Sequence, residues 1–69
     1  MEKFKLEDHD FIELNKLLKI MSWVASGGEA KQVIDEGLVS VNGEVETRRR
    51  KKLRKGDSVK YLQNEARIE

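Results

Sequence analysis

The eight positions from Arg48 to Lys55 hold seven of the fourteen basic residues in this chain. Four of the seven are arginines, whose planar guanidinium groups form paired hydrogen bonds with phosphate oxygens. Like charges at such close range repel one another, a cost that a small domain is expected to avoid unless a counter-charge is bound. Residues 48–55, here named the basic segment, therefore predict binding of a polyanion, and nucleic-acid phosphate is the natural partner. The simpler alternative is a solvated loop without a ligand.

A second candidate anion site lies at the start of a predicted helix, where Ser26 and Glu29 form a Ser-x-x-Glu capping box. Gly27 and Gly28 fall in the first turn, where exposed amides and the helix dipole favour anions. A phosphate could approach closely there, although two small residues also suit an ordinary helix start. Lys31 either extends the basic surface or is a plain exposed lysine.

Residues for catalysis or metal binding are too few in this sequence. His9 is the single histidine and there is no cysteine, so a metal site and a histidine-assisted nucleophile both lack parts. His9 lies in a charged stretch and is expected at the surface. The carboxylates of Asp35 and Glu36, and of Glu44 and Glu46, would need an enclosed cleft, for which 69 residues offer little room. We expect no enzyme activity, no metal and no cofactor.

Two aromatic residues, Trp23 and Tyr61, could stack on unpaired bases, as aromatic side chains do in many RNA-binding modules. Trp23 stands between two predicted amphipathic helices, and Tyr61 stands in a predicted strand. Packing against the core is therefore the favoured interpretation for both, and stacking is the alternative.

The elements that would position these residues begin with a short edge strand, in which Phe4 and Leu6 alternate with charged residues. Leucines and a methionine then recur at i, i+3, i+4 and i+7, which predicts a helix over residues 11–21. Asp8 or Asp10 could cap this helix. Its apolar face consists of Leu14, Leu17, Leu18 and Met21.

A second helix of about ten residues is predicted from Ser26, and a helix this short must pack on the first to persist. Its apolar face consists of Ala30, Val33 and Ile34, and Gly37 suits a left-handed cap at its end.

A β-hairpin follows, because Asn42-Gly43 is the preferred pair for a two-residue turn with positive φ at both positions. Within the basic segment, Leu53 is expected to turn inward and pin the loop. A turn at residues 55–57 leads into a strand over residues 58–62, with Val59 and Tyr61 inward. A final turn at residues 63–65 precedes a last strand over residues 66–68. The predicted fold class is α+β: two short packed helices, a β-hairpin and a small, mostly antiparallel sheet.

The length, charge distribution and hydropathy of the chain limit its domain number and compartment. A chain of 69 residues is expected to form a single domain, residues 1–69, with a thin core built from its 38% of apolar residues. The net charge of +1 hides an uneven distribution, because residues 1–30 carry a net −2 and residues 31–60 a net +4. No apolar run approaches membrane-span length and no signal peptide is evident, so a cytoplasmic protein is expected.

An ordered set of small motifs resembles the RNA-binding domain first seen in small-subunit ribosomal protein S-four, over about residues 11–60. These motifs are Ser26-x-x-x-Ala30-Lys31-x-x-Ile34-x-x-Gly37-x-Val39-x-Val41-Asn42-Gly43 and Lys55-Gly56-Asp57-Ser58-Val59. Over its full length the chain is most similar to the small, free-standing bacterial YbcJ-type members. The residues that match that pattern are Phe4, Leu6, Glu13-Leu14, Leu17-Leu18-Lys19, Trp23, Ser26-Gly27, Ala30-Lys31, Glu36-Gly37 and Glu46-Thr47-Arg48.

The resemblance implies an alpha-L RNA-binding motif that contacts structured RNA, ribosomal or transfer, as a monomer. The implied surface combines the two helices, the hairpin and the loop beyond it. Gly27 departs from the pattern, because many members have an arginine there. A ribosomal or RNA-processing protein is a candidate second partner, and the runner-up function is an adaptor whose basic face docks on an acidic protein. The implied RNA-binding residues are Ser26, Gly28, Lys31, Asn42, Gly43, Arg48, Arg49, Arg50 and Lys51.

Overall fold

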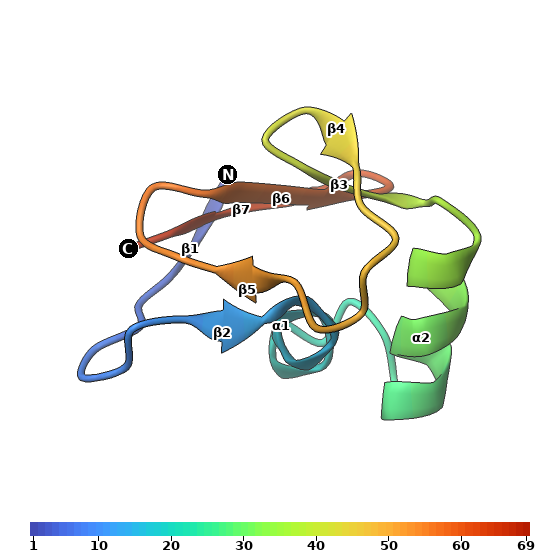
Figure 1. Cartoon of the computed structure of the whole chain (residues 1–69), viewed down its shortest axis with the longest axis horizontal. Helices are drawn as coiled ribbons and strands as arrows, with labels where there is room; N and C mark the ends of the chain where they lie inside the picture. Colours follow the sequence, from blue (N-terminus) through green and yellow to red (C-terminus); the bar gives the residue numbers. More distant parts are fainter.

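Two helices and a two-stranded ribbon lie on one side of a five-stranded sheet (Figure 1). The computed structural model describes residues 1–69. The elements in chain order are β1 (Glu2–Phe4), β2 (Ile12–Glu13), α1 (Leu14–Ile20), α2 (Gly27–Asp35), β3 (Val39–Val41), β4 (Glu44–Val45), β5 (Lys52–Leu53), β6 (Ser58–Tyr61) and β7 (Asn64–Ile68).

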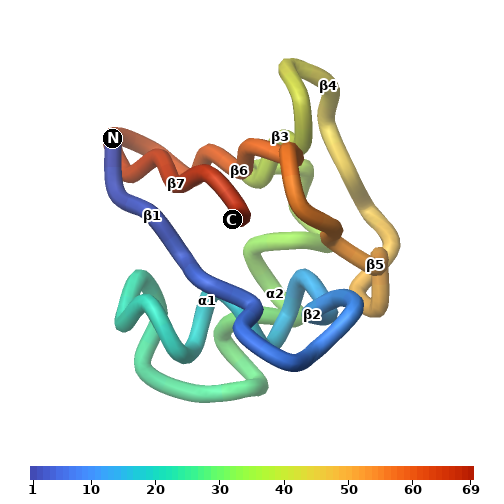
Figure 2. The backbone as a smooth tube through the Cα atoms, turned by 90° about the vertical axis from the view of Figure 1, so that its left-hand side faces the viewer, coloured from blue at the N-terminus to red at the C-terminus, as the bar shows by residue number.

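The five-stranded sheet has the order β1-β7-β6-β3-β4. Its edge strand β1 runs parallel to β7, and the other neighbouring pairs are antiparallel. Strands β2 and β5 form a separate antiparallel ribbon, in which Ile12 pairs with Leu53 and Glu13 with Lys52. Figure 2 shows β7, β6 and β3 above both helices. The predicted α+β class with a mostly antiparallel sheet is confirmed.

The core lies between the sheet and the helices. In α1, Leu14, Leu17 and Leu18 are fully buried, which confirms the predicted helical face, and Met21 packs against its edge. Leu53 is also fully buried, so the basic segment is pinned inward at this position as predicted. Neither helix has the length and apolar character that a membrane crossing requires. The core is completed by Leu6, Ile12, Val24, Ala30, Val33, Ile34, Val39, Val41, Val59, Tyr61 and Ile68.

The start of α1 differs from the sequence-based prediction. The helix begins at Leu14, not at residue 11, and the predicted cap from Asp8 or Asp10 is wrong. Ile12 and Glu13 belong to β2 instead, and Glu13 occupies the N-cap position without a side-chain capping bond. Pairing with β5 holds these two residues in an extended conformation, so the helix cannot begin earlier.

Both ends of α2 follow the predicted signals. The Ser26 hydroxyl accepts a hydrogen bond from the amide of Glu29 at 3.1 Å. The Glu29 carboxylate accepts from the amide of Ala25 at 2.7 Å, one residue before the position of a standard capping box. Gly37 has a φ of +76°, and the amides of Gly37 and Leu38 donate to carbonyls of the last turns. These bonds form a Schellman cap.

The hairpin between β3 and β4 has the predicted two-residue turn. Asn42 and Gly43 have φ values of +53° and +86°, which matches a type I′ turn. The last hairpin differs slightly from the prediction, because its turn lies at Leu62-Gln63 rather than at residues 63–65. Leu62 adopts the left-handed conformation there, with a φ of +57°, and β7 consequently begins at Asn64.

Candidate nucleic-acid interface

Main-chain hydrogen bonds attach the basic segment to the start of α1. The amide of Leu14 donates to the carbonyl of Lys51 at 2.9 Å, and the amide of Asn15 donates to the carbonyl of Arg49 at 3.0 Å. The amide of Lys51 donates to the carbonyl of Arg48 at 3.2 Å and closes a turn within the segment. The first amides of a helix have no acceptor inside it. The carbonyls of the basic segment supply acceptors for the first two amides of α1, and the same bonds hold the segment against the helix. The cations of the segment therefore project from a defined backbone.

Arg48 is held by a carboxylate two residues before it. Its guanidinium donates to both oxygens of Glu46, with Nε to Oε2 at 2.9 Å and Nη2 to Oε1 at 3.0 Å. Its amide also donates to Oε2 at 2.9 Å. Hydrogen bonds from Arg48 lower the pKa of Glu46 to about 2, despite the opposing effect of burial. Arg48 is therefore a positioned cation whose charge is partly neutralised.

Arg49 reaches the other helix. Its guanidinium donates through Nε to Oδ1 of Asp35 at 3.1 Å and through Nη2 to Oδ2, so the pair is bidentate. The hydrogen bond from Arg49 holds the pKa of Asp35 below its ordinary value. Asp35 is the last residue of α2, so this pair connects the basic segment to the end of that helix.

Arg50 and Lys51 form no ion pair in the protein. Together with Arg48 and two later residues of the basic segment, they surround a hollow of about 440 Å³ that contains no apolar and no acidic lining residue. A hollow lined by positive charge alone concentrates anions, because the fields of its walls add. This cationic hollow is lined by Arg48, Arg50, Lys51, Lys52 and Arg54.

Three predicted site residues belong to α2: Ser26 is its N-cap, and Gly28 and Lys31 lie within the helix. Lys31 is exposed and lies four positions before Asp35, so the two residues share one face. That face borders the basic segment, because Asp35 contacts Arg49. Ser26 and Gly28 lie at the opposite end of this nine-residue helix, about 14 Å and about 11 Å along its axis from Asp35.

Asn42 and Gly43 form the tip of the first hairpin. The Asn42 side chain is occupied within the fold: its Nδ2 donates to Asp57 at 3.0 Å, and its Oδ1 accepts from the amide of Ser58 at 2.9 Å. These two bonds fix the orientation of the Asn42 side chain and connect the hairpin tip to the turn before β6, and one donor and one acceptor position remain for a ligand. Figure 1 shows this tip and the first turn of α2 at opposite ends of the molecule.

The structure thus brings the predicted arginines and Lys51 together. Lys31 lies one helical turn from Asp35, the partner of Arg49, and the two pairs Ser26/Gly28 and Asn42/Gly43 lie at the periphery. No role for Phe11 was predicted from the sequence, and Lys52 and Arg54 were not among the candidate RNA-binding residues, although both line the cationic hollow. The alternation of side chains around Leu53 could have identified Lys52 and Arg54. Because Leu53 points inward, the residues on either side of it point outward on the same face. No signal marked Phe11, because its partner strand was not predicted.

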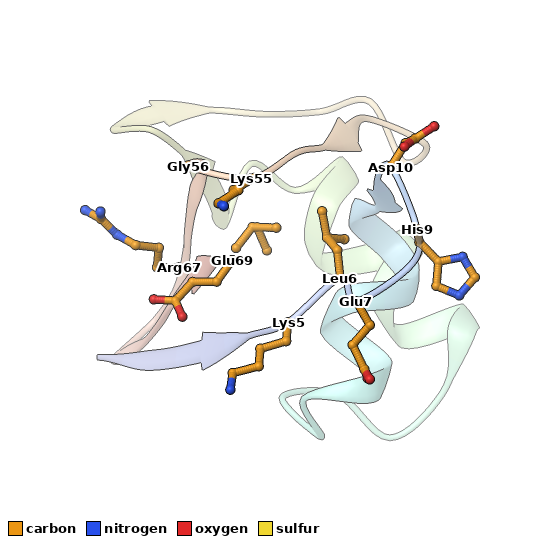
Figure 3. A pocket seen from close by; sticks show the side chains of 10 residues that line it. Lys5, Leu6, Glu7, His9, Asp10, Lys55, Gly56, Arg67 and Glu69 are labelled. Carbon is orange, nitrogen blue, oxygen red and sulfur yellow. The ribbon is translucent and has the colours of Figure 1, made fainter.

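The largest hollow of the molecule lies elsewhere, between the N-terminal segment and the last strand (Figure 3). It measures about 760 Å³ and mixes charges of both signs, including Lys55, Arg67 and Glu69. His9 is exposed, as predicted, and its ring points away from the hollow (Figure 3). No group of three or more potential ligands is arranged to hold a metal ion.

The two aromatic residues considered for stacking are used in packing. Tyr61 is buried in the core with 8% exposure. Trp23 is half-buried against the core, and its Nε1 donates to Glu2 at 3.2 Å. The core interpretation is therefore confirmed for both residues.

The two helices, the mixed five-stranded sheet and the hairpin match the alpha-L fold, a class of small α+β domains. The chain belongs to the S4 domain family, whose model matches residues 4–69. It is 46% identical over 61 residues to YbcJ of Escherichia coli (strain K12), with 88% of this chain and 87% of that protein covered. YbcJ of Shigella flexneri matches to the same extent.

A solved structure extends the likeness from sequence to fold. The solution structure of YbcJ from E. coli, described as revealing an alfaL motif involved in RNA binding, matches with a TM-score of 0.75 and 41% identity. The match covers 99% of this chain and 86% of that one. The resemblance inferred from the motifs is confirmed.

Proposed function

We propose that this chain binds structured RNA, ribosomal or transfer RNA, through contacts with its phosphates and its shape. The observation that carries the proposal is the cationic hollow, whose five lining residues are all arginine or lysine. The RNA binding described for the E. coli relative supports RNA as the ligand. A role in ribosome assembly, translation or RNA metabolism would follow from the RNA that is bound.

This surface suits structured RNA better than it suits duplex DNA recognised by its base sequence. A-form RNA hides its base edges in a deep, narrow groove and presents phosphates and 2′-hydroxyls instead. The surface offers arginines and lysines on an anchored loop, and its neighbouring helix α2 is only nine residues long and ends at the loop. We therefore propose recognition of backbone and shape rather than of base sequence.

Within the surface, Arg50 and Lys51 are the primary phosphate contacts, because no carboxylate pairs with them. Arg48 and Arg49 contribute positioned but partly neutralised charge. Lys31 extends the surface along α2, and Ser26 with Gly28 would meet a strand that continues to the start of that helix. Asn42 and Gly43 serve binding indirectly, by fixing the hairpin.

The test is a salt titration of binding to a fluorescently labelled, structured RNA fragment, followed by anisotropy. If about four to six phosphates are neutralised, the log-log slope of affinity against salt should be roughly −3 to −5. A flat response between about 50 and about 200 mM salt would contradict phosphate recognition.

Two competitions separate RNA from other partners of a basic surface. Unlabelled RNA should displace the probe more effectively than DNA of the same sequence, because A-form shape is part of the proposed recognition. Equal displacement would indicate unselective phosphate binding. If partners captured from a lysate survive nuclease treatment and no RNA is bound, the protein-adaptor function replaces this proposal.

A further inference from the structure

The ribbon of β2 and β5 has one buried and one outward face. Ile12 and Leu53 are paired across it and both point into the core. Side chains alternate along a strand, so Phe11 and the neighbours of Leu53 fall on the outward face. There the Lys52 ammonium lies 4.9 Å from the centre of the Phe11 ring, and the Arg54 guanidinium carbon lies 5.5 Å from it. Phe11 is therefore a half-buried aromatic ring flanked by two cations.

Phe11 stands where two hollows meet. Lys52 and Arg54, the cations above its ring, also line the cationic hollow. The ring itself lines a second hollow, of about 540 Å³, whose apolar walls are Phe4, Leu6, Phe11, Ile12 and Ile20. The two hollows share no lining residue, but the Phe11 ring in the wall of the second lies under two cations that line the first.

We propose that Phe11 is the stacking platform for one unpaired nucleotide of the bound RNA, with the phosphate of that nucleotide among Lys52, Arg54 and the rest of the cationic hollow. This inference deepens the proposed function and rests on it. A nucleotide joins an anionic group to a flat aromatic one, which is the combination that the two adjoining hollows would accept. Paired bases keep their faces inside the duplex, so only a bulged, looped or terminal base is available to stack.

The charge around the ring agrees with this ligand. The hollow beside the ring is also lined by the carboxylates of Glu7 and Glu13. Lys5 and Lys16 line it as well, and the Lys16 ammonium lies 3.8 Å from the Glu13 carboxylate and offsets its negative charge. Both cations above Phe11 are exposed and free of ion pairs, so a phosphate can reach them. Aromatic stacking tolerates any base, so the subsite would select for an unpaired base and not for its sequence.

The experiment compares two RNA hairpins whose strands are joined by the same ethylene-glycol linker in place of loop nucleotides, and which differ only in one bulged adenosine. The wild-type chain is expected to bind the bulged hairpin about tenfold more tightly than the perfect one, the usual scale for one stacked base. Phe11→Leu should abolish that preference, because leucine offers no aromatic face on which the bulged base can stack. Phe11→Tyr, which keeps the ring, should retain the preference. Thermal unfolding of each variant controls for stability.

A spectroscopic readout tests stacking in the wild-type chain without any substitution. The chain has two phenylalanines, so the ring protons of Phe11 are readily assigned by NMR. Addition of the bulged hairpin should shift them upfield through the ring current of the stacked base, and the perfect hairpin should not. Equal affinity for both hairpins with no such shift overturns this inference and leaves the proposed function standing. Failure to bind either hairpin overturns both.

Discussion

Arg49 in the basic segment and Asp35 at the end of α2 form a bidentate ion pair that joins two parts of the proposed RNA surface. The pair is about half exposed on both sides, so solvent screens it and its contribution to stability is small. We expect its main effect to be on RNA affinity. Arg49 already has an anionic partner, and a phosphate would have to replace that partner.

Arg49 and its neighbour Arg50 should therefore differ in their contribution to RNA affinity. Arg50→Ala removes an unpaired cation and should reduce the magnitude of the salt slope by about 0.9. Arg49→Ala should reduce it by less, because Asp35 already neutralises part of that charge. Parallel salt titrations of the two variants measure the difference. A larger loss for Arg49→Ala would mean that Arg49 leaves Asp35 for phosphate in the complex.

The Glu46 carboxylate should make the stability of the fold pH-dependent. Its pKa is about 2 in the folded chain against an ordinary value of 4.5, so between these values the unfolded state binds more protons. The contribution of Glu46 is then fully present above about pH 4.5 and lost as the pH falls toward about 2. Urea unfolding should show a smaller acid-induced loss of stability for Glu46→Gln than for the wild type. Identical pH profiles would contradict the role given to the Glu46–Arg48 pair.

Substitution by alanine should change the stability of the fold in opposite directions at two glycines of the predicted site. Gly43 has a φ of +86° and open space around it, so Gly43→Ala should cost about 1 to 2 kcal/mol through backbone strain alone, without changing the RNA affinity of folded protein. Gly28 has no positive φ and lies in a helix, so Gly28→Ala should be neutral or stabilising by up to about 1 kcal/mol. Thermal unfolding checks both values. Weaker RNA binding by the stable Gly28→Ala variant would indicate that RNA approaches the start of α2, and unchanged binding would remove Gly28 from the site.

Local signals in the sequence predicted α2 and the first hairpin well. The Ser26 cap, the left-handed Gly37 and the Asn42-Gly43 turn each depend on residues within a few positions of one another. Their physical causes are therefore visible in a short stretch of sequence. The same holds for the helical face of α1, where leucine spacing predicted the buried residues.

Features that depend on distant partners could not be predicted in this way. The start of α1 was misplaced because Ile12 and Glu13 pair with Leu53 and Lys52, about forty positions later in the chain. Strands of two residues have no measurable periodicity. The ion pair of Arg49 with Asp35 is non-local as well, so the paired Arg49 and the unpaired Arg50 could not be distinguished from the sequence.

The central claim is that RNA is bound by the cationic hollow and not by positive charge in general. Its most direct test compares two charge-matched double variants in the same salt titration. Arg50→Gln with Lys51→Gln removes two unpaired cations of the hollow. Lys60→Gln with Arg67→Gln removes two exposed cations of the five-stranded sheet that form no ion pair. The account predicts that the first variant lowers the magnitude of the salt slope by about two units and weakens binding, whereas the second keeps the wild-type slope. Equal losses in the two variants, or no loss in the first, would contradict it.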